Sequence, residues 1–250
     1  NSLAATVAAS LRMLGDPVYT AFFPVFSRLA TASDVRAMSG WYHRASQIMS
    51  VAVLPMAGVM IFFPKEVVFT WTGSHMVAES MAPLVRILAC GTAFSLLSSI
   101  AYALQLAYGW TRLGFLGNMI SLAVFTPALV VAVQHYGATG AAVAWALLNL
   151  GYLSIGVRVM HCRLLPGEHI RWYFSDVALP AVAVCAAACA LRVYFHGVEA
   201  RIVNLFAFGT VYAILLAVAL LAVPGLWGVL WSEGHRQESR LYRVISKCAR

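Results

Sequence analysis

Apolar runs of roughly 20 residues recur along this chain, and they constrain its fold more than any other feature. A helix of that length crosses a hydrocarbon layer about 30 Å thick. The runs do not alternate polar and apolar residues with the period of two that membrane barrel strands need. Hydrophobic residues make up 62% of the chain and charged residues only 10%, so a water-facing surface would lack polar groups. The sequence predicts an all-α, polytopic transmembrane helix bundle.

Apolar runs and helix breakers together predict about seven membrane spans. The predicted spans are 5–29, 45–63, 83–108, 113–134, 139–161, 176–195 and 202–223. The first five spans form one group over residues 1–161, two more helices follow within 162–230, and 231–250 is a basic tail expected at the cytoplasmic leaflet. The first span is longer than one crossing needs, which predicts a tilt or a break at Gly15-Asp16-Pro17.

The distribution of Lys and Arg predicts the orientation of the spans. If the segment after the first span is cytoplasmic, most of the 17 Lys and Arg residues lie on that side. The chain then starts outside a bacterial inner membrane and ends in the cytoplasm. This asymmetry also accounts for the net charge of +8, so we expect no nucleic-acid partner. Aromatic residues near span ends, such as Trp172 and Tyr173, are predicted to anchor the spans at the interface.

Motifs for catalysis or metal binding are absent from the sequence. It contains no HExxH, GxSxG or GxxxxGK[ST] pattern, and its seven His residues are scattered. Cys185 and Cys189 share a helical face without an accompanying His or carboxylate, so they are expected to be packing residues. We therefore expect no enzyme, no metal site and no cofactor.

Arg12 and Asp16 are charged residues within the first apolar span, one helical turn apart. Asp16 lies about 18 Å from the inner boundary at Arg28, close to mid-membrane. A charge facing lipid there costs at least about 2.5–3.5 kcal/mol. One alternative is that the two residues pair with each other. The other is that Arg12 faces a cavity and binds an anionic ligand, with phosphate as the natural match, while Asp16 tunes Arg12 or binds a coupling cation or proton.

Prolines inside the predicted spans indicate helices that bend. Each removes one backbone hydrogen bond, which is tolerated where a helix lines a cavity or must flex. The predicted hinge residues are Pro17, Pro24, Pro55 and Pro127.

Four further polar residues are weaker candidates for a substrate-binding route, namely Arg86, Gln105, Asn118 and Asn149. Any of the three amides can instead form a hydrogen bond between helices, worth about 0.6 kcal/mol. Arg86, near an outer boundary, can extend its guanidinium to the interface.

A series of short motifs appears in a fixed order along residues 1 to 160. They are "AFFPVFSRLA" at 21–30, Tyr42-x-Arg44-Ala45 before the span with Pro55, "WTG" at 71–73, "RILACGTAF" at 86–94, "LQLAYGWTR" at 104–112 and "GATGAAVAW" at 137–145. In order and loop placement this series resembles the polysaccharide-repeat flippases, which belong to the multidrug/oligosaccharidyl-lipid/polysaccharide exporter superfamily.

The resemblance implies a transporter of two helical lobes around a central cavity that opens alternately to each side. This chain would form the second lobe, starting at about the eighth helix of roughly fourteen. The chain starts at Asn1 without Met or a signal peptide, which agrees with a fragment that lacks the first lobe. A cationic cavity residue of the family carries over to Arg12 by helix position.

The expected function is transfer of a polyprenyl-pyrophosphate-linked oligosaccharide across the inner membrane for cell-surface polysaccharide assembly, with a proton or sodium ion as a coupling ion. A cation-coupled multidrug exporter of the same superfamily is the first alternative. Because such exporters bind cationic drugs, they are expected to place carboxylates in the cavity, where this chain offers Asp16 beside Arg12. A membrane-embedded enzyme of glycan assembly is disfavoured, since the chain has no large outer loop and no clustered acid-base residues.

Overall fold

The structure is a computed structural model that describes residues 2–194 and 201–223, and the elements in these ranges are helical. The α-helices are α1 (Ser2–Ala9), α2 (Arg12–Thr31), α3 (Val35–Phe62), α4 (Pro64–Thr72), α5 (His75–Ala107), α6 (Thr111–Gly151), α7 (Val157–Leu164), α8 (His169–Arg171), α9 (Leu179–Tyr194) and α10 (Arg201–Leu221). Two π-helical segments, η1 (Tyr152–Gly156) and η2 (Trp172–Ala178), continue these helices without a break. The predicted all-α class is confirmed, and the predicted tail, 231–250, lies outside the described residues.

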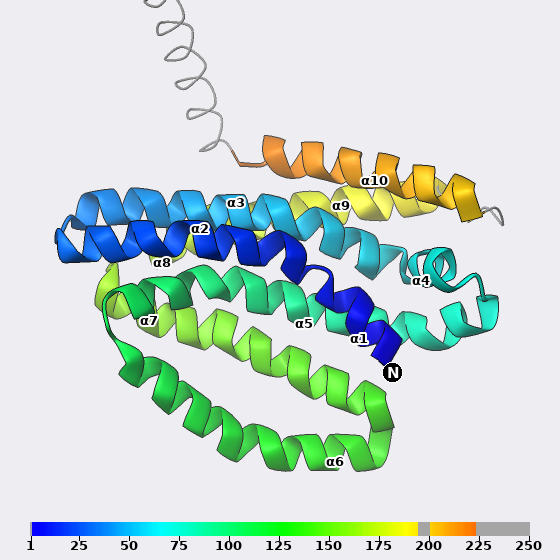
Figure 1. Cartoon of the computed structure of the whole chain (residues 1–250), viewed down its shortest axis with the longest axis horizontal. Helices are drawn as coiled ribbons and strands as arrows, with labels where there is room; N and C mark the ends of the chain where they lie inside the picture. Colours follow the sequence, from blue (N-terminus) through cyan, green and yellow to red (C-terminus); the bar gives the residue numbers. More distant parts are fainter. Residues whose placement is uncertain (1, 195–200, 224–250) are drawn as a thin grey trace, which may run out of the picture.

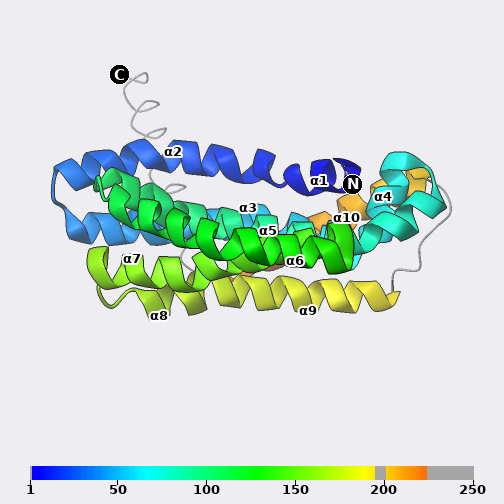
Figure 2. The same ribbon diagram turned by 90° about the horizontal axis from the view of Figure 1, so that it is seen from below.

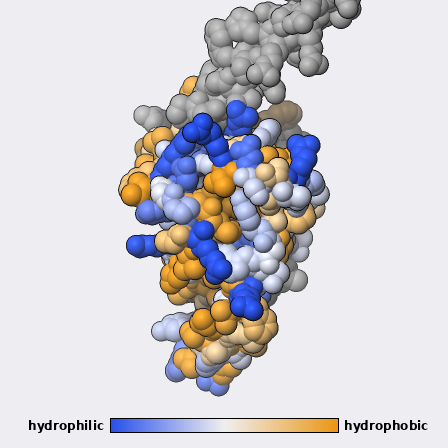
Figure 3. Space-filling view, turned by 90° about the vertical axis from the view of Figure 1, so that its left-hand side faces the viewer, coloured by the Kyte–Doolittle hydropathy of each residue, from blue (hydrophilic) through white to orange (hydrophobic). Residues whose placement is uncertain are grey.

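The long helices lie side by side and run alternately in opposite directions (Figures 1 and 2). Three connections, 32–34, 108–110 and 165–168, meet at one end of the bundle, at the left of Figure 1. Hydrophilic side chains gather on this end (Figure 3). Arg residues of this end, among them Arg36, Arg112 and Arg163, are exposed. Arginines that the sequence assigns to the cytoplasmic side therefore lie together at one end of the bundle. Which side of the membrane this end faces stays a prediction.

In the described part of the chain, four helical stretches are long and apolar enough to cross a membrane, namely Val35–Phe62, His75–Ala107, Thr111–Leu164 and His169–Val193. A shorter apolar helix covers Phe206–Leu221. Each of the seven predicted ranges overlaps a described helix, but α3 begins ten residues and α5 eight residues before the predicted spans 45–63 and 83–108. The number of spans stays a prediction. Membrane association follows from these lengths and compositions.

Gly137 divides the longest of these stretches into two antiparallel arms. Its backbone has φ 57° and ψ −137°, inside what is otherwise continuous helix. A side chain would be strained at this positive φ, which a glycine adopts freely. The chain reverses so tightly that a Cβ on Gly140 would lie 2.1 Å from the carbonyl oxygen of Ala132. The result is the helical hairpin that extends below the bundle in Figure 1.

The core of the bundle lies around α3 and α5, and the hairpin lies outside it. In the most apolar part of α3, 72% of residues are buried, whereas no residue is buried in the corresponding part of Thr111–Leu164. Apolar side chains such as Phe115, Ile120 and Val131 are more than half exposed on the hairpin. An exposed apolar surface of this extent is what a lipid-facing helix presents.

The first predicted span is broken, but not where the sequence suggested. The helix is interrupted at Ser10 and Leu11, between α1 and α2, and it continues through the predicted position at Gly15-Asp16-Pro17. At the interruption some backbone hydrogen bonds span three residues instead of four, as in the bond from Leu11 N to Ala8 O at 3.3 Å. Gly15 is instead a packing position, because an added Cβ there would lie 2.6 Å from Leu96 of α5.

Candidate functional site

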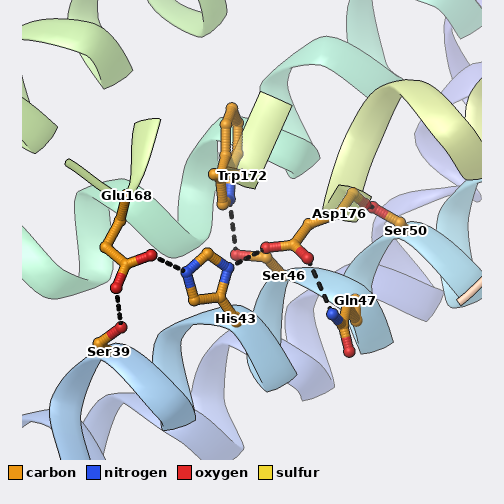
Figure 4. Close-up of polar contacts among 8 residues, drawn as sticks. All are labelled: Ser39, His43, Ser46, Gln47, Ser50, Glu168, Trp172 and Asp176. Atoms are coloured by element: carbon orange, nitrogen blue, oxygen red, sulfur yellow. Dashed lines mark hydrogen bonds and ion pairs between the residues drawn. The ribbon is translucent and has the colours of Figure 1, made fainter. Parts of the chain in front are cut away.

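A buried stripe of polar side chains runs along one face of α3. Ser39, His43, Gln47 and Ser50 are spaced by three or four residues, so they share one side of the helix. His43 is only 3% exposed and Ser50 is fully buried. Polar groups buried among apolar helices need hydrogen-bond partners. The partners lie more than 120 residues further along the chain, on the segment from Glu168 to Asp176 (Figure 4).

Asp176 is the fully buried carboxylate at the centre of this cluster. Its Oδ1 accepts a hydrogen bond from Gln47 Nε2 at 2.8 Å, and its Oδ2 is in close contact with His43 Nδ1. Its backbone carbonyl accepts from Ser50 Oγ at 2.6 Å. Pro180 follows four residues later and has no N–H to donate to this carbonyl. The Ser50 hydroxyl thus donates to this carbonyl from α3, where Pro180 cannot.

Glu168 receives the other side of the His43 ring. Its Oε2 lies 3.0 Å from His43 Nε2, and its Oε1 accepts from Ser39 Oγ at 2.7 Å. Its side chain is 29% exposed, whereas that of Asp176 is fully buried. His43 is therefore held between one sealed carboxylate and one that reaches water.

Trp172 closes the cluster from the side of η2. Its Nε1 donates to Ser46 Oγ at 2.8 Å, and its ring stacks on Tyr42 with a centroid distance of 6.4 Å. His161 of α7 adds an edge contact to Tyr42 at 5.3 Å. Trp172 is fully buried, so the prediction that it anchors a span at the membrane interface is wrong. Its amphipathic ring finds an apolar surface and an acceptor inside the bundle instead.

The electrostatics of the cluster favour a positive charge on His43. A neutral imidazole carries one N–H, whereas both ring nitrogens of His43 face carboxylate oxygens. Only the imidazolium donates to both carboxylates at once. Two carboxylates on one buried cation also reduce the free energy needed to keep that charge away from water.

The hydrogen bond from Ser39 holds the pKa of Glu168 below its ordinary value of 4.5, with a further contribution from His43. A lowered folded-state pKa means that this stabilisation is complete above pH 4.5 and is lost as pH falls through the folded value. Replacing Ser39 with alanine is expected to raise the pKa of Glu168, so that acid destabilisation begins at higher pH. Thermal denaturation of the purified protein along an acid series measures this. A Ser39→Ala profile identical to that of the unchanged protein would contradict it.

Arg12 and Asp16 lie on the outer face of α2. Both side chains are exposed, and no ion pair joins these two described residues. The alternative in which they neutralise each other is not the arrangement found. Thr20 is an exposed polar residue four positions further along, and it lies on the same side of the helix. Arg28 is exposed too, but it is turned by about 160° around the helix from Arg12. We call the set Arg12, Asp16 and Thr20 the α2 polar face.

Arg86 binds within the bundle. Its Nε donates to the backbone carbonyl of Ile61 at 2.9 Å, at the last turn of α3. The last carbonyls of a helix have no partner within the helix, and a nearby arginine both donates to them and complements their partial negative charge. Helix capping thus accounts for Arg86 without a substrate.

The three amide candidates are separated from the α2 polar face in the chain and act locally. Asn118 Oδ1 accepts from Tyr152 at 2.9 Å, which joins the two arms of the hairpin. Asn149 Nδ2 donates to Trp145 O of its own helix at 2.9 Å. Gln105 is buried near the end of α5. For Asn118, the hydrogen bond between helices is the alternative that the structure presents.

The four predicted hinge prolines lie inside helices that continue past them. Pro17 and Pro24 are exposed on α2, Pro127 is exposed on α6, and Pro55 is buried in α3. Their role as hinges stays a prediction. Within the ranges 2–194 and 201–223, no group of three His, Cys, Asp or Glu side chains is arranged to hold a metal ion.

No family model, curated protein or solved structure matches this chain.

Sequence reasoning missed the buried cluster and treated its residues as scattered. The signal was the spacing of Ser39, His43, Gln47 and Ser50 along a helix that is otherwise apolar. A second signal was the spacing of Asp176 and Pro180. Because Pro180 has no N–H, it cannot donate to the backbone carbonyl of Asp176, the residue that also carries the carboxylate. Neither signal shows that the polar residues of α3 bind Asp176, because this contact depends on how α3 and η2 pack against each other.

Proposed function

We propose that the chain is one lobe of a membrane transporter that moves a polyprenyl-pyrophosphate-linked oligosaccharide from the cytoplasmic to the outer leaflet. The observation that carries this proposal is the α2 polar face, which is exposed along a predicted membrane span whose other residues are mostly apolar. The sequence resemblance to polysaccharide-repeat flippases leads to the same transport class.

Charges on α2 need water or a polar partner beside them. Along the helix, the α2 polar face from Arg12 to Thr20 covers eight residues, or about 12 Å, all of it inside the predicted first span. Exposure of such a row to acyl chains would cost several kcal/mol. A water-filled cavity shared with a first lobe removes this cost, and α2 would then form part of the cavity wall.

The chemistry of the face favours an anionic headgroup. The face offers one guanidinium group, from Arg12, and one carboxylate, from Asp16. A guanidinium group binds phosphate oxygens in a pair of parallel hydrogen bonds, which a compact ammonium group cannot do. A pyrophosphate therefore matches Arg12 in charge and geometry, while the glycan stays in water and the prenyl chain stays in lipid.

The test uses cells in which the full-length protein carries Arg12→Ala. We expect lipid-linked oligosaccharide to accumulate on the inner leaflet, with roughly a tenfold loss of export, since one charge-assisted contact is worth about 1.5–3 kcal/mol. Arg12→Lys keeps the positive charge but loses the paired hydrogen bonds of the guanidinium group. Its export is expected to lie between that of Arg12→Ala and that of the unchanged protein. Arg36→Ala is the matched control, because Arg36 is exposed at the start of α3 and lies off the α2 polar face.

A multidrug exporter is the second candidate, and the exposed carboxylate of Asp16 on the same face is the observation that favours it. In that case Asp16→Asn changes drug susceptibility while glycan export stays normal. Normal export and normal susceptibility in both the Arg12→Ala and Asp16→Asn cells would overturn both candidates.

A further inference from the structure

We propose that His43 is a proton-binding site that ties the 165–168 connection to α3 when it is protonated and releases Glu168 when it is not. The site itself is argued from its contacts, and only its use as the coupling site of transport rests on the proposed function. The ligand is a single proton exchanged with water at the basic end of the bundle.

The number of donors around His43 changes with its protonation. Protonated, the ring donates through Nδ1 to Asp176 and through Nε2 to Glu168. After loss of one proton, one ring nitrogen presents a lone pair to a carboxylate oxygen, and that contact becomes repulsive. The same proton thus decides whether one or both carboxylates stay bound.

The two carboxylates are not equivalent, which fixes which contact is lost. Asp176 is fully buried and keeps a second donor in Gln47, on a segment that packs along α3. Glu168 belongs to the short connection between α7 and α8 and has a partly exposed side chain. Water replaces the Glu168 contact at little cost, but it cannot reach Asp176. Deprotonated His43 therefore keeps Asp176 and releases Glu168.

Other charged groups near His43 and Glu168 determine the net charge of the cluster. Arg171 of α8 adds a positive charge in range of both His43 and Glu168. With His43 protonated, the set His43, Arg171, Glu168 and Asp176 sums to zero, and loss of the proton leaves one net negative charge. The remaining titratable groups that face the cluster are Tyr42 of α3, His161 of α7, His169 of α8 and Tyr173 of η2.

The backbone beside the pair is also unusual. Asp176 lies within the seven-residue π-helical segment η2, and the segment ends two residues before Pro180. Single π-helical turns recur at functional sites, where they trade regular backbone bonds for a positioned side chain. Here that turn carries the one carboxylate, among the described residues, that is fully buried. A helix whose bonds are already irregular at the proton site can adjust when the site changes charge.

The experiment places a spin label at Pro166→Cys, an exposed position in the connection. The full-length protein, with its five native cysteines replaced, is studied in nanodiscs between about pH 5 and 8. We expect a restrained label at low pH and a mobile label at high pH, in a one-proton transition. His43→Gln and Glu168→Gln should each abolish the transition, and His169→Gln, which changes a neighbouring histidine of α8, should keep it.

A label whose mobility does not depend on pH, or a transition that persists in His43→Gln, overturns the proposal. Loss of the transition in His169→Gln would show that His169, and not His43, binds the proton, and this result also overturns the proposal. Glu168→Gln alters a partly exposed side chain, so the test survives even if His43→Gln fails to fold. Because the label needs no substrate, a pH transition together with normal glycan export in Arg12→Ala cells would reject the flippase and keep the proton site.

Discussion

Replacing Asp176 with alanine is expected to lower the free energy of unfolding by about 3–5 kcal/mol. The substitution removes the acceptor of both His43 Nδ1 and Gln47 Nε2 and leaves a buried histidine without its sealed counter-charge. The loss is therefore larger than that of a single hydrogen bond. Denaturation of the purified protein in detergent measures it.

Ser175→Ala is the matched control for this prediction. Ser175 precedes Asp176 in the same π-helical segment and is exposed, so its loss is expected to change stability by no more than about 0.5 kcal/mol. Adding His43→Leu to Asp176→Ala should recover part of the stability, since the unpaired imidazole is then gone. A double variant as unstable as the sum of the singles would show that the two residues are not coupled.

Gly140→Ala is expected to destabilise the protein by about 3 kcal/mol. The added Cβ would lie 2.1 Å from Ala132 O and 2.9 Å from Tyr136 Cβ, so the two arms of the hairpin must move apart. The obstacle is backbone, which has no other rotamer to adopt. The midpoint of thermal denaturation, compared with that of the unchanged protein, measures the loss.

Gly151→Ala provides the comparison within the same hairpin. Gly151 has helical dihedral angles, φ −60° and ψ −45°, and open space where its Cβ would stand. Alanine at such a position is expected to be neutral or to stabilise by up to about 1 kcal/mol. Equal destabilisation by both substitutions would contradict the tight reversal at Gly137.

Span lengths made most of the fold predictable. Long apolar runs predict helices directly, because a segment that lies in lipid must form its backbone hydrogen bonds within itself. The separation of 113–134 from 139–161 in the prediction agrees with the reversal at Gly137. The break between α1 and α2 was not predicted at its true position, because Ser10 and Leu11 are not helix breakers, whereas Gly15-Asp16-Pro17 contains two.

The candidate site was predictable in part. Arg12 and Asp16 were selected because charge in an apolar span is costly, and both are exposed on one helix. His43 and Asp176 were overlooked, because each is an ordinary residue in its own segment and 133 positions separate them. Their importance arises only from packing, which no local pattern encodes.

The π-helical turn at η2 makes the chain tolerant of a change in length at this place. Such a turn holds more residues than an α-turn, so it absorbs an extra residue that would otherwise rotate everything that follows by about 100°. Deleting Ala178 would therefore return the turn to α-helix and leave the buried Val184 and Ala188 facing the bundle. The same deletion within the regular part of α9 would rotate the apolar residues that follow it away from the bundle.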